Sequence, residues 1–486
     1  MEEARHTRKS FLSGIALPAA AAGILPALLQ FTGCGRKFTG NPELPNIIFI
    51  TADNLGWHDL SCYGNRNIST PGTDRLATEG VRFTRAFVTS SSCSPSRASF
   101  LTGQYPHTCG VTALTHLKKA KALSPFSNTL PKLLRKAGYN TALQGKWHVS
   151  PYLPVSWYGF NERLSGMLPK DWHIRDLKKT REFLNRNRKN RFYLQMNFIN
   201  SHRDPYGEYQ FDPDFPVDPE DVRVPQYMAM PDWPEIREDL ARYYSQNLRM
   251  EKLITELLVF LDETGLAGNT LVLFTSDNGP HYPGMISALY DRGVAVPLIA
   301  RLPGRIRPGR TSANMISGVD IAPTLLEAAG VPVPADMQGR SFLETLFSGR
   351  SAPRRDAVYL EIDEHVRYIP TRAVRTGRWK YIRNYSDNPI GLDQNNHMDW
   401  AHRMCELPGH PWKRPRPEEE LYDLKTDPQE QKNLAKNPRF SKTLTEMRML
   451  LRTHMKETRD PWLDRPFTRD FDPGAYQRDP AGHRYW

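Results

Sequence analysis

The sequence PNIIFITAD at positions 45–53 predicts a buried β-strand that ends in a polar residue. Three further runs end in the same way and a fourth is apolar throughout: 139–149, 191–200, 269–276 and 296–300. Helical patterns lie between these runs, at 130–137, 174–187 and 236–263. Continuous apolar strands that alternate with helices are typical of a mostly parallel sheet covered by helices on both faces. We therefore expect a large α/β domain over residues 44–350.

Polar side chains close several of these predicted strands. They are Asp53 and Asn54, Lys146 and His148, His202, and Asp277 and Asn278. In open α/β sheets, ligands bind outside the carboxyl ends of the strands. We therefore expect these side chains to converge on one site.

The pattern changes after about residue 350. Residues 358–362, 372–376 and 379–385 alternate with period two, which predicts an antiparallel sheet with a tight turn at positions 377–378. A stretch rich in Pro, Glu and Arg follows at 408–420, and a helical pattern runs over 439–456. We expect a smaller α+β domain over residues 351–486.

Composition excludes several classes of protein. The chain has 486 residues, of which 39% are hydrophobic and 24% charged, so it is neither disordered, fibrous nor a polytopic membrane protein. The net charge of +12 is compatible with nucleic acid, an anionic membrane surface or an acidic polysaccharide as partner. The sequence contains no run of five or six like charges and no nucleic-acid-binding motif. We therefore expect no nucleic-acid partner.

The first 34 residues have the layout of a secretory signal. Three basic residues precede the apolar stretch 11–31: Arg5, Arg8 and Lys9. The segment TRKSFL at 7–12 resembles a twin-arginine export motif, and FTGC at 31–34 resembles a lipoprotein cleavage box. We expect an exported protein, in the periplasm or on the outer surface, with a possible lipid anchor at Cys34. An uncleaved membrane anchor is the alternative.

The strongest local signal is the stretch SCSPSRASFLTG at positions 92–103. Cys93 begins a predicted helix, Pro95 stands in its first turn, and Arg97 returns to the same end one turn later. The amides and dipole of a helix N-terminus favour an anion beside it. The alternative is a buried small cysteine on a turn. The stretch resembles the signature of type I sulfatases, in the alkaline phosphatase superfamily, whose cysteine is converted to formylglycine.

The polar strand ends match that family in the same order. The ligands of the family's divalent metal are matched by Asp53, Asn54, Asp277 and Asn278. In the family, the modified cysteine, here Cys93, also contacts this metal. Oxygen ligands of this kind suit calcium. Lys146 and His148 match the residues that grip sulfate, and His202 matches the histidine near the leaving group. Taken singly, the triplet at 277–279 is a common turn, and a lone histidine is more often structural. The resemblance implies calcium and formylglycine as cofactors and a formylglycine-generating enzyme as maturation partner.

The resemblance also implies a mechanism. One hydroxyl of the formylglycine hydrate attacks sulfur while calcium polarises the sulfate. Arg97 and Lys146 neutralise the developing charge. His202 is the expected proton donor to the leaving group, and His148 the expected base that lets the second hydroxyl expel sulfate.

Within the family, the C-terminal region resembles the N-sulfoglucosamine sulfohydrolases. The likeness rests on ELYD at 420–423, DP at 427–428, NLA at 433–435, NPRF at 437–440, TRDPW at 458–462 and PTRAV at 370–374. It implies a sulfated glycosaminoglycan substrate, namely N-sulfated glucosamine of heparan sulfate, with Arg372 as a candidate substrate contact. Three alternatives stay open: an O-sulfatase for another sulfated polysaccharide, a phosphatase or phosphonate hydrolase, and a non-catalytic glycan binder.

Two positions depart from the family pattern. Asn54 stands where many relatives carry a second Asp, so the metal meets one less negative charge. Ile286 stands nine residues after Asp277, where relatives carry Lys or Arg against the sulfate. Arg292 is a candidate replacement for that cation, with exposure to solvent as the alternative.

Overall fold

The computed structural model describes residues 44–469 apart from 118–119, 167–170, 205–206, 349–354, 366, 390–397 and 408–414. The predicted export signal, with Cys34, lies outside the described residues. The described residues all belong to one compact unit. None of the helices within the described ranges is both long and apolar enough to cross a bilayer.

The larger sheet has eight strands in the order β4-β3-β5-β1-β6-β7-β2-β8. They are β1 (Asn46–Ala52), β2 (Val81–Phe87), β3 (Asn140–Gly145), β4 (Glu162–Arg163), β5 (Phe192–Asn197), β6 (Thr270–Ser276), β7 (Leu298–Arg301) and β8 (Arg310–Ser317). Strand β7 runs antiparallel to both of its neighbours, and the other pairs are parallel. The predicted mostly parallel sheet is confirmed.

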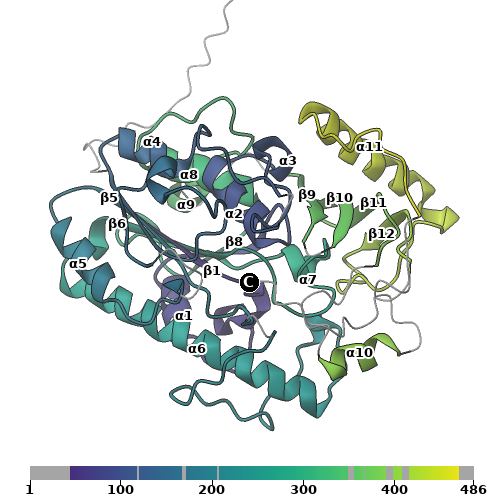
Figure 1. Ribbon diagram of the computed structural model, residues 1–486, viewed down its shortest axis with the longest axis horizontal. Helices are drawn as coiled ribbons and strands as arrows, with labels where there is room; N and C mark the ends of the chain where they lie inside the picture. Colours follow the sequence, from purple (N-terminus) through teal and green to yellow (C-terminus); the bar gives the residue numbers. More distant parts are fainter. Residues whose placement is uncertain are drawn as a thin grey trace, which may run out of the picture. The chain divides into compact units, whose positions relative to one another are not determined.

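Helices cover both faces of this sheet (Figure 1). One face carries α1 (Pro71–Thr78), α5 (Lys178–Arg186) and α6 (Pro234–Glu263), and the other α2 (Cys93–Thr102), α4 (Leu130–Lys136), α8 (Ile321–Ala328) and α9 (Leu343–Ser348). Shorter helices are α3 (Pro106–Cys109), α7 (Asp291–Val294) and α10 (Asp399–Cys405). Single 3₁₀ turns include η1 (Trp57–Asp59), η2 (Ser61–Tyr63), η3 (Val155–Tyr158), η5 (Gln226–Met228), η6 (Ala267–Asn269), η7 (Gly318–Asp320) and η8 (Pro438–Phe440).

Strand β1 explains why its sequence is apolar without interruption. Successive side chains of a strand point to opposite faces. Ile47 and Phe49 belong to the core that contains residues of α2 and α4, while Ile48 and Ile50 belong to the core that contains residues of α6. Because both faces are covered, both sets must be apolar.

The second sheet is antiparallel, in the order β12-β11-β10-β9. Its strands are β9 (Ala357–Glu364), β10 (Tyr368–Thr376), β11 (Trp379–Asn384) and β12 (Glu419–Asp423), and α11 (Ser441–Glu457) packs on it. This confirms the predicted smaller sheet. One apolar core contains Phe87 of β2 together with Leu360 of β9. The boundary expected at residue 350 therefore separates two sheets that share a core.

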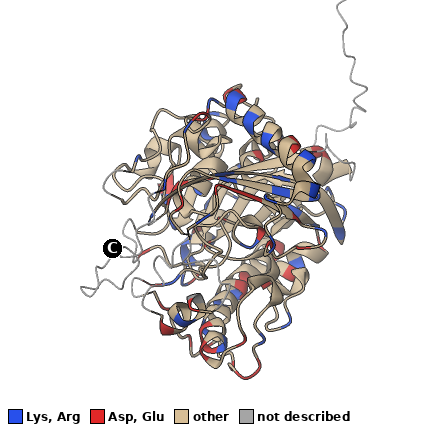
Figure 2. Cartoon of the chain, turned by 90° about the vertical axis from the view of Figure 1, so that its right-hand side faces the viewer, with Lys and Arg blue, Asp and Glu red and all other residues tan. Residues whose placement is uncertain are grey.

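Basic and acidic residues are interspersed along the elements that face the viewer in Figure 2. The positive surplus of the sequence is therefore not gathered into a single stripe on that side.

Candidate active site

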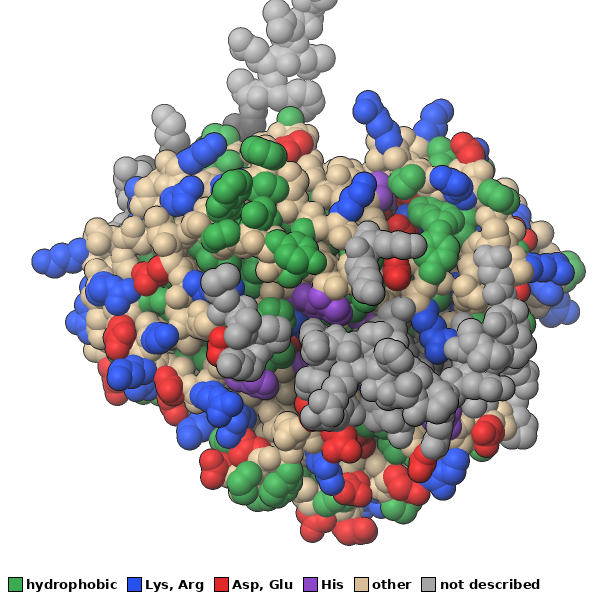
Figure 3. Space-filling model, viewed as in Figure 1, with side chains coloured by type: hydrophobic (Ala, Val, Ile, Leu, Met, Phe, Trp, Pro, Cys, Tyr) green, Lys and Arg blue, Asp and Glu red, His purple; other side chains and the backbone are tan. Residues whose placement is uncertain are grey.

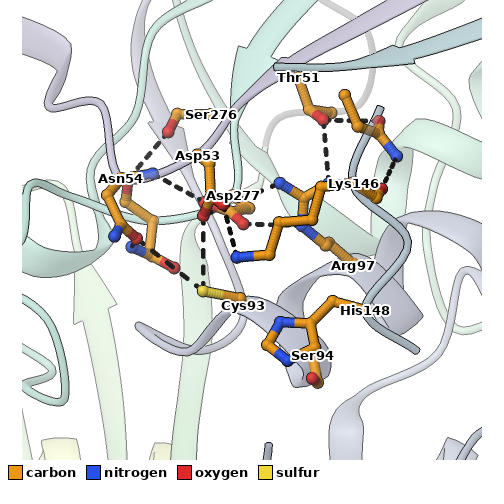
Figure 4. Close-up of polar contacts among 12 residues, drawn as sticks. Thr51, Asp53, Asn54, Cys93, Ser94, Arg97, Lys146, His148, Ser276 and Asp277 are labelled. Atoms are coloured by element: carbon orange, nitrogen blue, oxygen red, sulfur yellow. Dashed lines mark hydrogen bonds and ion pairs between the residues drawn. The ribbon is translucent and has the colours of Figure 1, made fainter. Parts of the chain in front are cut away.

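The polar residues at the strand ends meet, as expected, at one edge of the larger sheet (Figure 4). Asp53 follows β1, Lys146 follows β3 and Asp277 follows β6, while Cys93 is the first residue of α2. Parallel strands place their carboxyl ends on the same side, so residues far apart in sequence become neighbours. Histidine side chains are also visible near the centre of the face drawn in Figure 3.

Two buried cations and two buried carboxylates form the centre of the site. Lys146 Nζ lies 2.5 Å from Asp53 Oδ2, and Arg97 Nε lies 2.8 Å from Asp277 Oδ2. Although burial opposes charge, Lys146 and Arg97 hold the pKa of Asp53 below its ordinary value. Burial and the neighbouring Asp53 raise the pKa of Asp277 to about 6. The four groups balance in charge, which burial requires of ionised side chains.

Cys93 lies against this cluster. Its Sγ is 3.5 Å from Asp53 Oδ1 and 3.9 Å from Asn54 Oδ1, and the residue is 1% exposed. Burial raises the pKa of the Cys93 thiol well above its ordinary value, and the carboxylates of Asp53 and Asp277 raise it further, against Lys146 and Arg97. The thiolate is the nucleophilic form of cysteine. An unmodified Cys93 is therefore a poor nucleophile in this position.

Arg97 does not hold Cys93 directly in this structure. Its Nε donates to Asp277, its Nη1 donates to Thr51 Oγ1 at 3.3 Å, and its Nη2 is 3.9 Å from Asp53 Oδ1. Although Arg97 returns to the same helix end as Cys93, its guanidinium contacts the carboxylates beside the cysteine and not the cysteine itself. Thr51, on β1, had no role in the sequence-based prediction.

The oxygen atoms of the cluster fit a hard divalent cation. Asn278 Oδ1 is buried and accepts no hydrogen bond from the described residues. Asn278 Nδ2 donates to Asn54 Oδ1 at 2.5 Å, which draws both amides together beside the two carboxylates. Asp53, Cys93 and His202 offer ligand atoms that lie within 4.8 Å of one another. Carboxylate and amide oxygens are the ligands that calcium prefers.

His202 has a defined tautomer. Its Nδ1 donates to the backbone carbonyl of Arg203 at 2.5 Å, since a carbonyl oxygen only accepts. Burial and the nearby Lys146 and His281 lower the pKa of His202 well below its ordinary value. The neutral ring then carries its lone pair on Nε2. Arg203 is itself fixed by Asp239, at 2.6 Å, and by stacking over Tyr209 at 4.0 Å.

His148 has a histidine partner that the sequence did not reveal. His116 Nδ1 lies 2.9 Å from His148 Nε2, and the two rings are stacked at 5.2 Å. Burial, Lys146 and His116 lower the pKa of His148 well below its ordinary value, and burial and Lys146 lower the pKa of His116 to about 4. One neutral ring therefore donates to the other. Nothing in the spacing of the two residues along the chain predicts this pair.

Replacing His116 by alanine is expected to lower kcat roughly tenfold, because loss of a partner that orients a functional histidine has an effect of this size. His116→Asn keeps a polar group near the position of Nδ1 and is expected to retain more activity. The measurement is sulfate release across pH 5–9. Equal losses in both variants, with an unchanged pH profile, would contradict an orienting role.

Arg292 and Arg372 make their contacts elsewhere. Arg292 Nε donates to Gly284 O at 3.0 Å and Nη1 to Gln429 O at 2.8 Å, and the residue is 8% exposed, so exposure to solvent was the wrong alternative. Arg372 is 2% exposed and pairs with Asp460 at 2.6 Å and Asp363 at 2.8 Å. Its guanidinium ties β10 to the segment after α11, which corrects its expected role in substrate contact.

Ile286 is buried and supplies no charge. The backbone N–H of its neighbour Ser287 donates to Ser91 O at 3.0 Å, which places this loop against the residues that precede Cys93. Among the described residues, the cations beside Cys93 are therefore Lys146 and Arg97. Arg292 does not replace the Lys or Arg that relatives carry at the position of Ile286.

This arrangement of a mostly parallel sheet, an oxygen-rich cluster and a buried cysteine at a helix start is that of a known class of hydrolases. The sulfatase family model matches residues 45–331, and a model described as N-sulphoglucosamine sulphohydrolase, C-terminal, matches residues 287–397. The chain belongs to the sulfatase family and is an enzyme of that class.

Two relatives illustrate the likeness. The chain is 31% identical to N-sulphoglucosamine sulphohydrolase of Homo sapiens, over 87% of this chain and 92% of that protein. It is 32% identical to an ulvan-active sulfatase of Formosa agariphila, over 83% of this chain and 78% of that protein.

Solved structures are similar over nearly the same span. One, in complex with its substrate D-glucosamine-2-N,6-O-disulfate, has a TM-score of 0.65 and 25% identity, and covers 87% of this chain and 99% of that chain. Another, of a 2-O glycosaminoglycan sulfatase, has a TM-score of 0.65 and 25% identity over 90% of this chain and 97% of that chain.

Proposed function

We propose that this sulfatase removes the N-linked sulfate of glucosamine residues in heparan-type glycosaminoglycans, with calcium and with formylglycine formed from Cys93. The observation that best supports this choice of substrate is the match of residues 287–397 to the C-terminal model of N-sulphoglucosamine sulphohydrolase. The relative of that name, similar over 87% of this chain, supports it.

Each group of the cluster has a part in this reaction. Calcium, when bound, supplies positive charge against the sulfate oxygens, and conversion of Cys93 supplies the paired hydroxyls that a thiol lacks. The ion would be held by the side-chain oxygens of Asp53, Asn54, Asp277 and Asn278. Lys146, held by Asp53 and fully buried, offers a preorganised cation at the reacting sulfate.

The two histidines would move protons. His148, fixed by His116, accepts a proton from the nucleophilic group. His202 must be protonated at Nε2 to serve the leaving nitrogen. Burial and Lys146 oppose that protonation in the free enzyme. A bound sulfate, being anionic, favours it, so the donor would form together with the substrate complex.

Export and maturation belong to the same proposal. The charged and apolar layout of residues 1–34 supports export to the periplasm or outer surface with a possible anchor at Cys34. The buried thiol of Cys93 supports maturation by a formylglycine-generating enzyme before turnover. Mass spectrometry of the mature N-terminus and of the peptide across residue 93 tests both.

Asn54→Asp is expected to tighten calcium binding by at least about tenfold, because it adds a negative charge beside Asp53 and Asp277. The backbone tolerates the change, since residue 54 has a φ of 63°, which Asp adopts nearly as readily as Asn. Calorimetric titration with calcium measures the effect. Asn185→Asp, on the exposed side of α5, controls for net charge. Equal affinities in wild type and Asn54→Asp would contradict the metal assignment.

A sulfate-release panel tests the substrate directly. We expect sulfate from N-sulfated glucosamine saccharides and little from matched 2-O- or 6-O-sulfated ones. Release only from O-sulfated saccharides would overturn the N-sulfatase assignment in favour of the O-sulfatase alternative, to which the ulvan-active relative gives support. Preference for p-nitrophenyl phosphate over p-nitrophenyl sulfate would overturn the sulfatase reaction itself.

A further inference from the structure

A hollow lies outside the cluster around Cys93. Its volume is about 550 Å³, in the range of ligand-binding clefts. Four segments border it: 57–67, 223–227, 291–292 with Arg375, and 424–430. The described residues of its wall include none of the groups assigned to the reaction.

One wall of this hollow is aromatic. The rings of Trp57 and His58 lie 3.7 Å apart, and those of His58 and Tyr227 are stacked at 4.8 Å. Burial lowers the pKa of His58 to about 4, so its ring is neutral at physiological pH. Neutral aromatic surfaces suit the apolar faces of sugar rings, which also expose polar edges.

The wall also contains four arginines. Arg66, Arg223, Arg292 and Arg375 line the hollow, against the carboxylates of Asp291 and Glu430. The negative charge of those two carboxylates is balanced by Lys380, whose Nζ lies 2.7 Å from Asp291 and 3.0 Å from Glu430.

One of the four arginines, Arg375, is paired with a carboxylate, and the other three keep their charge available. Arg292 donates to backbone carbonyls, as does Arg223 through Nη1, to Glu220 O at 2.7 Å. Arg66 and Arg223 are exposed. The hollow therefore presents a surplus of positive charge to a ligand.

The aromatic wall is connected to the loop that carries Asn54. Tyr227 donates to Asp59 Oδ1 at 2.5 Å, and Tyr243 donates both to Asp59 Oδ2 at 2.6 Å and to Asn54 O at 3.3 Å. On the other side, the backbone N–H of Gly279, next to Asn278, donates to Gly293 O at 2.8 Å. Hydrogen bonds thus connect the wall of the hollow both to the loop of Asn54 and to the loop of Asn278.

We propose that this hollow binds a further anionic sugar unit of the substrate chain, with its ring against Trp57, His58 and Tyr227 and its sulfate or carboxylate group against Arg66, Arg223 and Arg292. That the ligand is part of a glycosaminoglycan chain rests on the proposed function. That the bound unit is an anionic sugar follows from the residues that line the hollow. It predicts that oligosaccharides are bound more tightly than monosaccharides.

The test uses Arg66→Ala/Arg223→Ala. The backbone of Arg223 is fixed by Asn67, through hydrogen bonds of 2.9 and 3.0 Å, so removal of its side chain leaves this connection. For a heparin tetrasaccharide, we expect KM to rise about tenfold with unchanged kcat, as for loss of contacts that act only in binding. Activity on N-sulfoglucosamine as the monosaccharide should be unchanged.

The matched control is Arg135→Ala/Arg188→Ala, which removes two exposed arginines elsewhere and gives the same net charge. An equal rise in KM in the control, or no rise in the test variant, would overturn the proposal. Calorimetric binding of the tetrasaccharide to both pairs in the Cys93→Ala background tests the hollow without turnover. A tenfold weaker Kd only in the test pair would support the hollow even if heparin is not hydrolysed. No binding of the tetrasaccharide to the Cys93→Ala parent would overturn it.

Discussion

Cys93→Ala is expected to lower kcat by a factor on the order of 10⁶, the loss that follows removal of a covalent nucleophile in a protease. The reason is local. Residue 93 stands at the first position of α2, against Asp53 and Asn54, and its thiol is kept protonated by burial and by the carboxylates around it. In the proposed reaction, conversion to formylglycine makes this position reactive, and alanine removes the sulfur atom at which that conversion would take place.

The fold should survive this change. The side chain of Cys93 is small and makes only long contacts, of 3.5 and 3.9 Å, through sulfur. The Tm of Cys93→Ala should therefore stay within a few degrees of wild type. Sulfate release, together with mass spectrometry across residue 93, is the measurement. Cys93→Ser is the matched control and should also be inactive or complete a single turnover, unless the maturation enzyme accepts serine. Substantial turnover by Cys93→Ala would refute the nucleophile assignment.

Lys146→Met is expected to reduce both stability and activity. The Lys146 ammonium is fully buried and is paired with Asp53 at 2.5 Å. Although burial opposes its charge, Asp53 raises the pKa of Lys146, so it stays protonated. Its removal leaves Asp53 with Arg97 at 3.9 Å, and breaking a buried pair in this way costs roughly 3–5 kcal/mol. The free energy of unfolding, from denaturant titration in EDTA, measures this loss.

The same variant should lose about 10²–10³ in kcat, as for removal of one preorganised group that stabilises developing negative charge. Lys146→Met/Asp53→Asn separates the two effects. Removing both partners should restore much of the stability, since no unpaired charge remains, while activity stays low. A double variant less stable than Lys146→Met would contradict the ion-pair explanation.

The central strands could be predicted from the sequence, whereas the outer ones could not. Strand β1 is buried on both faces, and its unbroken apolar run follows from that burial. Strand β2 lacks an unbroken apolar run, because it contains Arg82, Thr84 and Arg85, and it was not among the predicted strands. Strand β8, at the sheet edge, is partly exposed and mostly polar at its start. Both form because neighbouring strands offer hydrogen-bonding partners, which is a property of the assembled sheet.

The residue types of the candidate site could likewise be predicted from the sequence. A cysteine at a helix start and oxygen-bearing residues after buried strands can be recognised locally, because each depends only on its own segment. Their partners cannot be recognised in this way: His116 beside His148, Thr51 beside Arg97, and Asp460 beside Arg372. Such pairs join segments that only folding brings together.

The sequence by itself thus determined the sheet class, and it picked out the candidate nucleophile and the candidate oxygen ligands, since hydrophobic pattern and local motif are properties of short stretches. Only the tertiary structure decided how the charges pair. It placed Lys146 on Asp53 and Arg97 on Asp277, and it directed Arg292 and Arg372 to backbone carbonyls and carboxylates elsewhere. The physical reason is that a buried charge takes the partner that packing brings within reach, and packing depends on the whole chain.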